Sequence, residues 1–305
     1  KLMEILSGFR NIVAVLPGNH DYYDDSVKVW KDFKDVMACY DNIMLLTEYR
    51  PYELEVAEKP VILYPALCTS RHSEANQNNL GWIRFESEGT YHIGVAHGAV
   101  EGETIDKEGQ YFLMKHSELE NIPVDVWLIG HTHVPFPSNL TENFMTANKI
   151  FNAGTHVQTD VSCNTEGVCF IIEIDDNKVV LAKKFVSGNI RFYRKNISIT
   201  AGEMKNILIR ELDDIDDSSV VDIILLGTVS AQEYEDRNKI VTEFLDRFLE
   251  GTYNDYNLNK LISKELIESE FPEVSFSAKL LTSLLEEPKE AQLAYELLKS
   301  LKEGK

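Results

Sequence analysis

Three short polar motifs, each following an apolar run, constrain this chain more than any other feature. Gly18-Asn19-His20-Asp21 comes after residues 12–16, His97 after 93–96, and Gly130-His131-Thr132-His133 after 126–129. Short apolar runs bounded by turn residues are typical of buried strands. Because ligands bind beyond the carboxyl ends of strands in open α/β sheets, we expect the three motifs to meet at one edge of a sheet.

The side chains in these motifs favour a metal site that acts on phosphate esters. Neutral imidazole is a good ligand for manganese, iron or zinc, and the Asn amide oxygen adds a hard donor. Two metal ions about 3.5–4 Å apart can polarise a phosphoryl oxygen. A nearby histidine that binds no metal can stabilise charge on the phosphate or protonate the leaving oxygen. We expect Asp21 to fix the tautomer of His20.

Composition excludes some classes of protein. The net charge of −20 argues against nucleic-acid binding by bulk attraction, although a local basic face stays compatible with it. No apolar run approaches the roughly 20 residues of a membrane span, so we expect no membrane association. The four cysteines form no close zinc-type pair, which favours a reduced, cytoplasmic protein.

The order of apolar runs predicts an α/β fold. Residues 61–64, 91–96 and 124–129 read as buried strands, and residues 24–40 as an amphipathic helix. A run of strands is expected between 150 and 193, and a further strong strand at 220–226. From residue 231 onward the pattern predicts an almost wholly helical region, broken near 251, 272 and 288.

At its polar motifs the chain resembles the calcineurin-like metallophosphoesterases. Their Gly-Asn-His-Asp/Glu, lone His and Gly-His-x-His motifs match residues 18–21, 97 and 130–133. The resemblance implies that Asn19, His97 and His131 ligate one metal ion and His133 the other, and that His20 stabilises the transition state. It also implies two divalent ions as cofactors. Manganese is the expected metal, with Fe²⁺, Zn²⁺ and Mg²⁺ as alternatives.

Two further motifs of the family do not occur in the sequence. No Asp is followed two residues later by His, and there is no Gly-Asp pair. In the family these motifs supply ligands that include the bridging carboxylate. We therefore expect the chain to begin partway through the family's domain, and this chain alone to be inactive while a longer parent is active.

The region after the metal motifs is similar to the DNA-repair exonuclease branch of the family, the nucleases of double-strand-break repair. Residues 150–155, 167–174 and 220–234 carry that similarity. Residues 177–199 contain basic residues and aromatic residues but no acidic one. Such a stretch can contact phosphates and stack bases, or simply form two exposed strands. The candidates for substrate binding are His156, Lys183, Lys184, Arg191, Arg194 and Lys195.

The resemblance implies a four-layer α/β sandwich core over residues 1–200 that lacks its first motifs, a small α/β capping domain over 201–250 and a helical region over 251–305. The expected substrate is DNA. The expected partner is a coiled-coil ATPase that docks on an apolar helix face such as Leu280, Leu281, Leu284 and Leu285, unless these leucines pack within their own domain; a homodimer is a further expectation. The alternatives are a small-molecule phosphomono- or diesterase and a catalytically incomplete binding or scaffold subunit.

Overall fold

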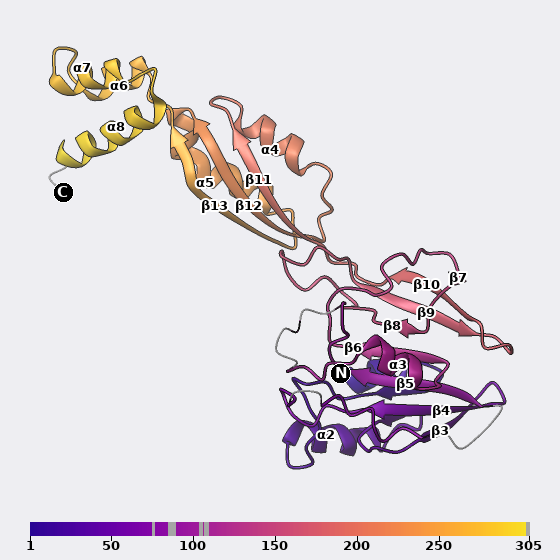
Figure 1. Cartoon of the computed structure of the whole chain (residues 1–305). Helices are drawn as coiled ribbons and strands as arrows, with labels where there is room; N and C mark the ends of the chain where they lie inside the picture. Colours follow the sequence, from indigo (N-terminus) through magenta and orange to yellow (C-terminus); the bar gives the residue numbers. More distant parts are fainter. Residues whose placement is uncertain (75–76, 85–89, 104–105, 107–109, 303–305) are drawn as a thin grey trace. The chain divides into compact units, whose positions relative to one another are not determined.

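The structure is a computed structural model that describes residues 1–74, 77–84, 90–103, 106 and 110–302 (Figure 1). The chain divides into two compact units. Unit 1 comprises residues 1–157 and 165–188, and unit 2 comprises residues 158–164 and 189–305. None of the helices in the described part of the chain has the length and apolar composition of a membrane span.

Unit 1 is built on a five-stranded sheet of order β3-β4-β5-β6-β8, in which β4, β5, β6 and β8 are parallel and β3 is antiparallel. Two smaller sheets accompany it: parallel β1-β2 and antiparallel β7-β10-β9. The elements are α1 (Leu2–Ser7), β1 (Val13–Val15), α2 (Lys28–Met37), β2 (Ile43–Leu45), β3 (Tyr52–Val56), β4 (Lys59–Ala66), β5 (Tyr91–His97), α3 (His116–Asn121), β6 (Val126–Gly130), β7 (Met145–Thr146), β8 (Ile150–Phe151), β9 (Val168–Ile174) and β10 (Val180–Val186).

The predicted strands around the motifs are confirmed. β5 and β6 pair in parallel, so their carboxyl ends lie at the same edge of the sheet. Trp127 and Ile129 of β6 pack into a core that includes Tyr64 and Leu119. Val126, which points to the opposite face, packs against Phe151 and the β10 residues. Apolar side chains on both faces explain why β6 reads as a continuous apolar run.

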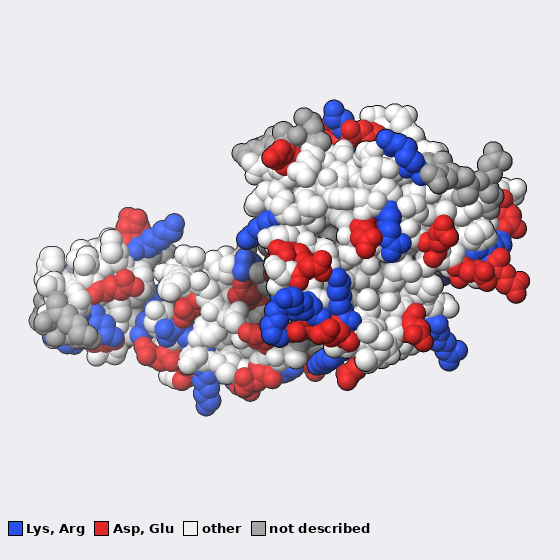
Figure 2. All heavy atoms as spheres, turned by 90° about the horizontal axis from the view of Figure 1, so that it is seen from below, with Lys and Arg blue, Asp and Glu red and all other residues white. Residues whose placement is uncertain are grey.

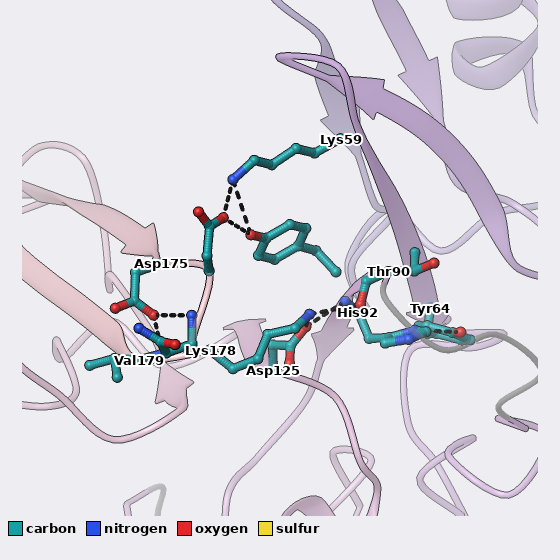
Figure 3. A network of polar contacts seen from close by, with 11 residues as sticks. Lys59, Tyr64, Thr90, His92, Asp125, Asp175, Lys178 and Val179 are labelled. Carbon is teal, nitrogen blue, oxygen red and sulfur yellow. Dashed lines mark hydrogen bonds and ion pairs between the residues drawn. The ribbon is translucent and has the colours of Figure 1, made fainter.

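A polar cluster fastens the turn between β9 and β10 to the amino-terminal ends of β5 and β6 (Figure 3). Lys178 Nζ donates to Asp125 Oδ2 at 2.8 Å and to the carbonyl oxygen of Thr90 at 2.7 Å. The same Asp125 oxygen accepts the backbone N–H of His92 at 2.8 Å. Lys178 has φ 62°, a left-handed conformation in which glycine is usual. Its contacts with Asp125 and Thr90 offset that backbone cost.

Unit 2 contains an all-parallel sheet of order β11-β12-β13 (Figure 1). The helices α4 and α5 pack into a single core with apolar residues of that sheet, and α6, α7 and α8 form a separate apolar cluster. The elements are β11 (Phe192–Ile199), α4 (Met204–Leu212), β12 (Val220–Val229), α5 (Ala231–Leu245), β13 (Glu250–Lys260), α6 (Lys264–Glu270), α7 (Phe276–Ser283) and α8 (Pro288–Lys302).

The prediction of an almost wholly helical region after residue 231 is wrong in one part. Residues 250–260 form the strand β13, which pairs with β12 from Val220 to Val229. β13 lies at the edge of the sheet and carries mostly polar side chains, so no apolar pattern marks it as a strand. The division into units also differs from the expected bounds at 200 and 250, because β11 pairs with β12 and β13 belongs to the same sheet.

Candidate metal centre

The ends of β5 and β6 place two motifs side by side. His97 is the register partner of Gly130, and the backbone N–H of Gly98 donates to the Gly130 carbonyl oxygen at 3.0 Å. A Cβ on Gly18, in the motif after β1, would lie 2.7 Å from Cε1 of His97, and one on Gly130 would lie 3.2 Å from Nδ1 of His97. The two glycines therefore leave the room that the His97 ring occupies.

Asn19 and His97 face each other directly. The Oδ1 atom of Asn19 lies 3.0 Å from Nε2 of His97, and the Nδ2 atom of Asn19 donates to the Arg71 carbonyl oxygen at 3.1 Å. The bond to Arg71 fixes the amide so that its oxygen points to the histidine. Asn19 is only 2% exposed, so the pair is held in a shielded position.

The two histidines of the centre are biased toward the neutral form that binds metal. Burial, with neighbouring His131 acting in the same direction, lowers the pKa of His97 to about 4. Burial also lowers the pKa of His131, and the positive charges that His20 and His133 carry when protonated act in the same direction. The carboxylate of Asp106 acts on His131 in the opposite direction. A neutral imidazole keeps a nitrogen lone pair for a ligand.

His131 lies against His97, with ring centroids 5.4 Å apart. Its φ of 123° falls in the region that favours glycine, and strained backbone of this kind is often found at functional sites. Asn19, His97 and His131, predicted as ligands of one metal ion, are thus gathered at one place in unit 1. Whether they bind a metal stays a prediction.

The other motif residues surround this group. His20 and Asp21 are exposed, and both lie within electrostatic range of His97. The Oδ1 atom of Asp21 accepts the backbone N–H of Gly18 at 2.8 Å. The expected bond from Asp21 to His20 is not among the hydrogen bonds of the described residues. His133 is exposed and lies within electrostatic range of His131.

The donor set fits one divalent ion better than two. In the described ranges, no three side chains among His, Cys, Asp and Glu are grouped as in a metal site. Asn19, His97 and His131 offer an amide oxygen and two imidazoles, and two of these donor atoms already point at each other across 3.0 Å. That set suits a first-row divalent ion. For a second ion the motifs add only His133.

Two side chains that the motifs did not indicate lie near His131, outside the set of metal donors. The Tyr111 ring lies 5.2 Å from that of His131, and the His72 ring lies 5.4 Å from that of Tyr111. Asp106 accepts the backbone N–H of Tyr111 at 3.0 Å. Tyr111 and His72 belong to loops, where no periodicity marks them, so only the fold brings them to the site.

A cavity of about 410 Å³ lies beside the centre, and its lining includes His97 and Gly130. Its other walls include Leu16, Leu128 and Phe170.

The candidate substrate residues are divided between the two units. His156, Lys183 and Lys184 belong to unit 1, whereas Arg191, Arg194 and Lys195 belong to unit 2. His156 is exposed, and its carbonyl oxygen accepts the hydroxyl of Ser187 at 2.8 Å.

Four of the basic side chains already have partners inside the protein. Lys184 Nζ lies 3.4 Å from Glu166 Oε1, and Lys183 Nζ lies 4.5 Å from the centre of the Phe144 ring. Arg194 Nε lies 2.7 Å from Asp222 Oδ2, and Lys195 donates to the Glu211 carbonyl oxygen. Figure 2 shows acidic and basic side chains interspersed on the face that it views. The basic stretch therefore does not form one uncompensated cationic strip.

Comparison with known proteins places the motifs in a family. Residues 1–135 match the sequence model of the family described as calcineurin-like phosphoesterase. This segment is a calcineurin-like phosphoesterase domain. The family hydrolyses phosphoesters and typically binds two metal ions, and the match includes all three motifs. No curated protein matches the chain. The phosphoesterase match ends at residue 135, so it does not describe unit 2.

Proposed function

We propose that the phosphoesterase domain acts on phosphodiesters and that its substrate is DNA. The observation that carries the hydrolytic part is the meeting of Asn19, His97 and His131 within the segment that matches the family. A bound divalent ion would supply Lewis acidity toward a phosphoryl oxygen. Asn19, His97 and His131 would hold it, and we expect Mn²⁺, with Fe²⁺, Zn²⁺ and Mg²⁺ as alternatives.

The exposed His20 is the proposed residue for the transition state. It lies beside the shielded donors, within electrostatic range of both His97 and His131. An imidazole in that place can donate a proton to the leaving oxygen or stabilise charge on the phosphate. Asp21 holds the loop of the motif through its bond to Gly18, which supports a positioning role for this carboxylate.

DNA as substrate is supported by the α/β part of unit 2, in which α4 and α5 pack with the parallel sheet in the way proposed for a capping domain. Support from the basic residues is weaker, because Lys184, Arg194 and Lys195 have acidic or carbonyl partners within their own unit. A small phosphate ester stays the second candidate, since the metal donors alone do not require a nucleic acid.

The test measures both binding and cleavage. Fluorescence anisotropy of a labelled single-stranded oligonucleotide should show binding that requires Mn²⁺ and is lost in His97→Ala but kept in His20→Ala. An affinity for the oligonucleotide that changes neither with EDTA nor in His97→Ala would contradict the proposal. Hydrolysis of p-nitrophenyl phosphate without binding or cleavage of the oligonucleotide would favour the small-ester alternative. Strong Mn²⁺-dependent cleavage by this 305-residue chain would contradict the prediction that it is inactive alone.

A coiled-coil ATPase partner is a separate proposal, supported by helix α8. Leu293, Leu297 and Leu301 follow one another at four-residue spacing and are 60%, 56% and 74% exposed. Such an unpaired stripe suits a helical partner. Of the four leucines expected for this role, Leu281 is buried, and Leu284 and Leu285 pack against the cluster of α6, α7 and α8.

The same stripe could pair with a second copy, so the test separates the two. Light scattering of the purified chain should give a monomer, and an antiparallel coiled-coil fragment of the partner should bind it. Leu297→Lys should abolish that binding. Leu266→Ala is the control: it disturbs the packing of α6, α7 and α8 and should leave the binding intact. A dimer that Leu297→Lys converts to a monomer would favour the homodimer.

A further inference from the structure

Four rings form a continuous series that leads out of the metal centre. His97 contacts His131, His131 contacts Tyr111, and Tyr111 contacts His72, with centroid separations of 5.4, 5.2 and 5.4 Å. His97, His131 and Tyr111 are half-buried, and His72 is exposed. The series therefore begins at the donors of the metal centre and ends at solvent.

The outer part of the series is held in place by the backbone. The N–H of Ala99, just beyond β5, donates to the Tyr111 carbonyl oxygen at 2.7 Å, and Asp106 accepts the Tyr111 N–H. The N–H of Ser73, next to His72, donates to the Gln110 carbonyl oxygen at 2.7 Å. Tyr111 and His72 thus have fixed positions relative to His97 and His131, although they come from different loops.

We propose that Tyr111 and His72 form a shelf on which a nucleobase of the substrate stacks. In a nucleotide, the base is joined to the phosphate through one sugar. Tyr111 is in ring contact with His131, so a base could reach the shelf while its phosphate lies at the metal centre. Planar rings attract each other in offset or tilted arrangements, and stacking on an aromatic side chain accepts any base. This proposal rests on the proposed function. The shelf would give the phosphoester site a preference for nucleotides over phosphate esters that carry no flat ring.

The experiment compares two probes in the presence of Mn²⁺: thymidine 5′-monophosphate and inorganic phosphate. Both present a phosphate to the metal centre, and only the first carries a base. The wild-type chain should bind the nucleotide about fivefold or more tightly than phosphate, as expected for one stacked base. His72→Ala and Tyr111→Leu should abolish this preference while leaving phosphate affinity unchanged.

Two further variants separate stacking from folding. Tyr111→Phe keeps the ring and should keep the preference. Tyr256→Ala removes a tyrosine that is 89% exposed in unit 2 and should change neither affinity. The fluorescence of the three tryptophans, at positions 30, 82 and 127 in unit 1, reports whether each variant is folded.

The outcomes distinguish the shelf from the hydrolase. Equal affinity for the two probes, or a preference that survives both His72→Ala and Tyr111→Leu, would overturn the shelf and leave the phosphoester site standing. A base preference that these variants abolish, in a protein whose affinity for both probes does not change when EDTA removes Mn²⁺, would uphold the shelf and contradict the metal-dependent site of the proposed function. Failure to bind either probe would overturn both.

Discussion

Nε2 of His97 lies 3.0 Å from Oδ1 of Asn19, so a residue at the end of β5 and a residue in the turn after β1 present their donor atoms to each other. Burial lowers the pKa of His97 to about 4, which leaves the imidazole neutral at physiological pH. A metal ion bound by both side chains would replace this hydrogen bond. The two donor atoms are close enough for one ion to bind both.

The first prediction concerns the number of bound ions. Isothermal titration with Mn²⁺ should give one ion per chain, because Asn19, His97 and His131 are gathered while His133 has no grouped carboxylate in the described ranges. His97→Ala should weaken binding by about 100-fold or more, beyond the 10–100-fold typical of residues that only orient a ligand. His116→Ala is the control, because His116 contacts Glu103 and Phe136. Two equivalent tight sites would contradict this account.

The second prediction tests the space around His97. In Gly18→Ala the new methyl group would lie 2.7 Å from Cε1 of His97, so the ring or the loop must move. We expect Mn²⁺ affinity to fall about 10–100-fold, the usual effect of disturbing a ligand's orientation. Gly81→Ala is the matched control, because a Cβ there meets nothing within 4 Å. Equal affinities in the two variants would mean that His97 is free to move.

The third prediction concerns the cluster that fastens the β9–β10 turn. Lys178→Met should destabilise unit 1 by about 1–2 kcal/mol, because Asp125 is largely shielded and loses a charged donor. Lys59→Met, which removes a more exposed pair with Asp176, should cost less than about 1 kcal/mol. Urea unfolding followed by tryptophan fluorescence measures both, since all three tryptophans lie in unit 1. An equal loss of unfolding free energy in Lys178→Met and Lys59→Met would show that the Lys178 contacts stabilise unit 1 no more than the exposed pair does.

The sequence was sufficient for the strands and motifs around the metal centre, because β5 and β6 are buried and short and the motifs follow them directly. It was not sufficient where a residue's role depends on a distant contact. Tyr111 and His72 meet only through the fold, and Arg194 pairs with Asp222 on a neighbouring strand. The strand β13 was not predicted, because an edge strand with polar side chains shows no alternation of apolar and polar residues.

The fourth prediction concerns acid sensitivity in unit 2. Partial burial would raise the pKa of Glu233, but hydrogen bonds from the backbone N–H groups of Gly202, Met204 and Ser230 outweigh it, so the pKa lies below its ordinary value of 4.5. The folded state thus favours the carboxylate. Its contribution, about 1 kcal/mol as for a helix cap, is present above pH 4.5 and is lost as the pH falls through the lowered pKa.

Glu233→Gln tests this pH dependence. At neutral pH the variant should exchange the amide hydrogens of residues 200–205 and 230–233 faster than the wild-type chain, measured by mass spectrometry. The difference should shrink once the pH is well below 4.5, because Glu233 is then protonated in both the folded and unfolded states. A difference that is constant with pH would show that the carboxylate charge does not stabilise this end of α5.

The most direct test of the central claim is to locate the metal. Crystals soaked in Mn²⁺ should show an anomalous difference peak within bonding distance of Asn19 Oδ1, a His97 ring nitrogen and a His131 ring nitrogen, and His97→Ala crystals should lack it. An absence of density among these three side chains, or a peak there that persists in His97→Ala, would contradict the assignment of this site as the metal centre of the phosphoesterase domain.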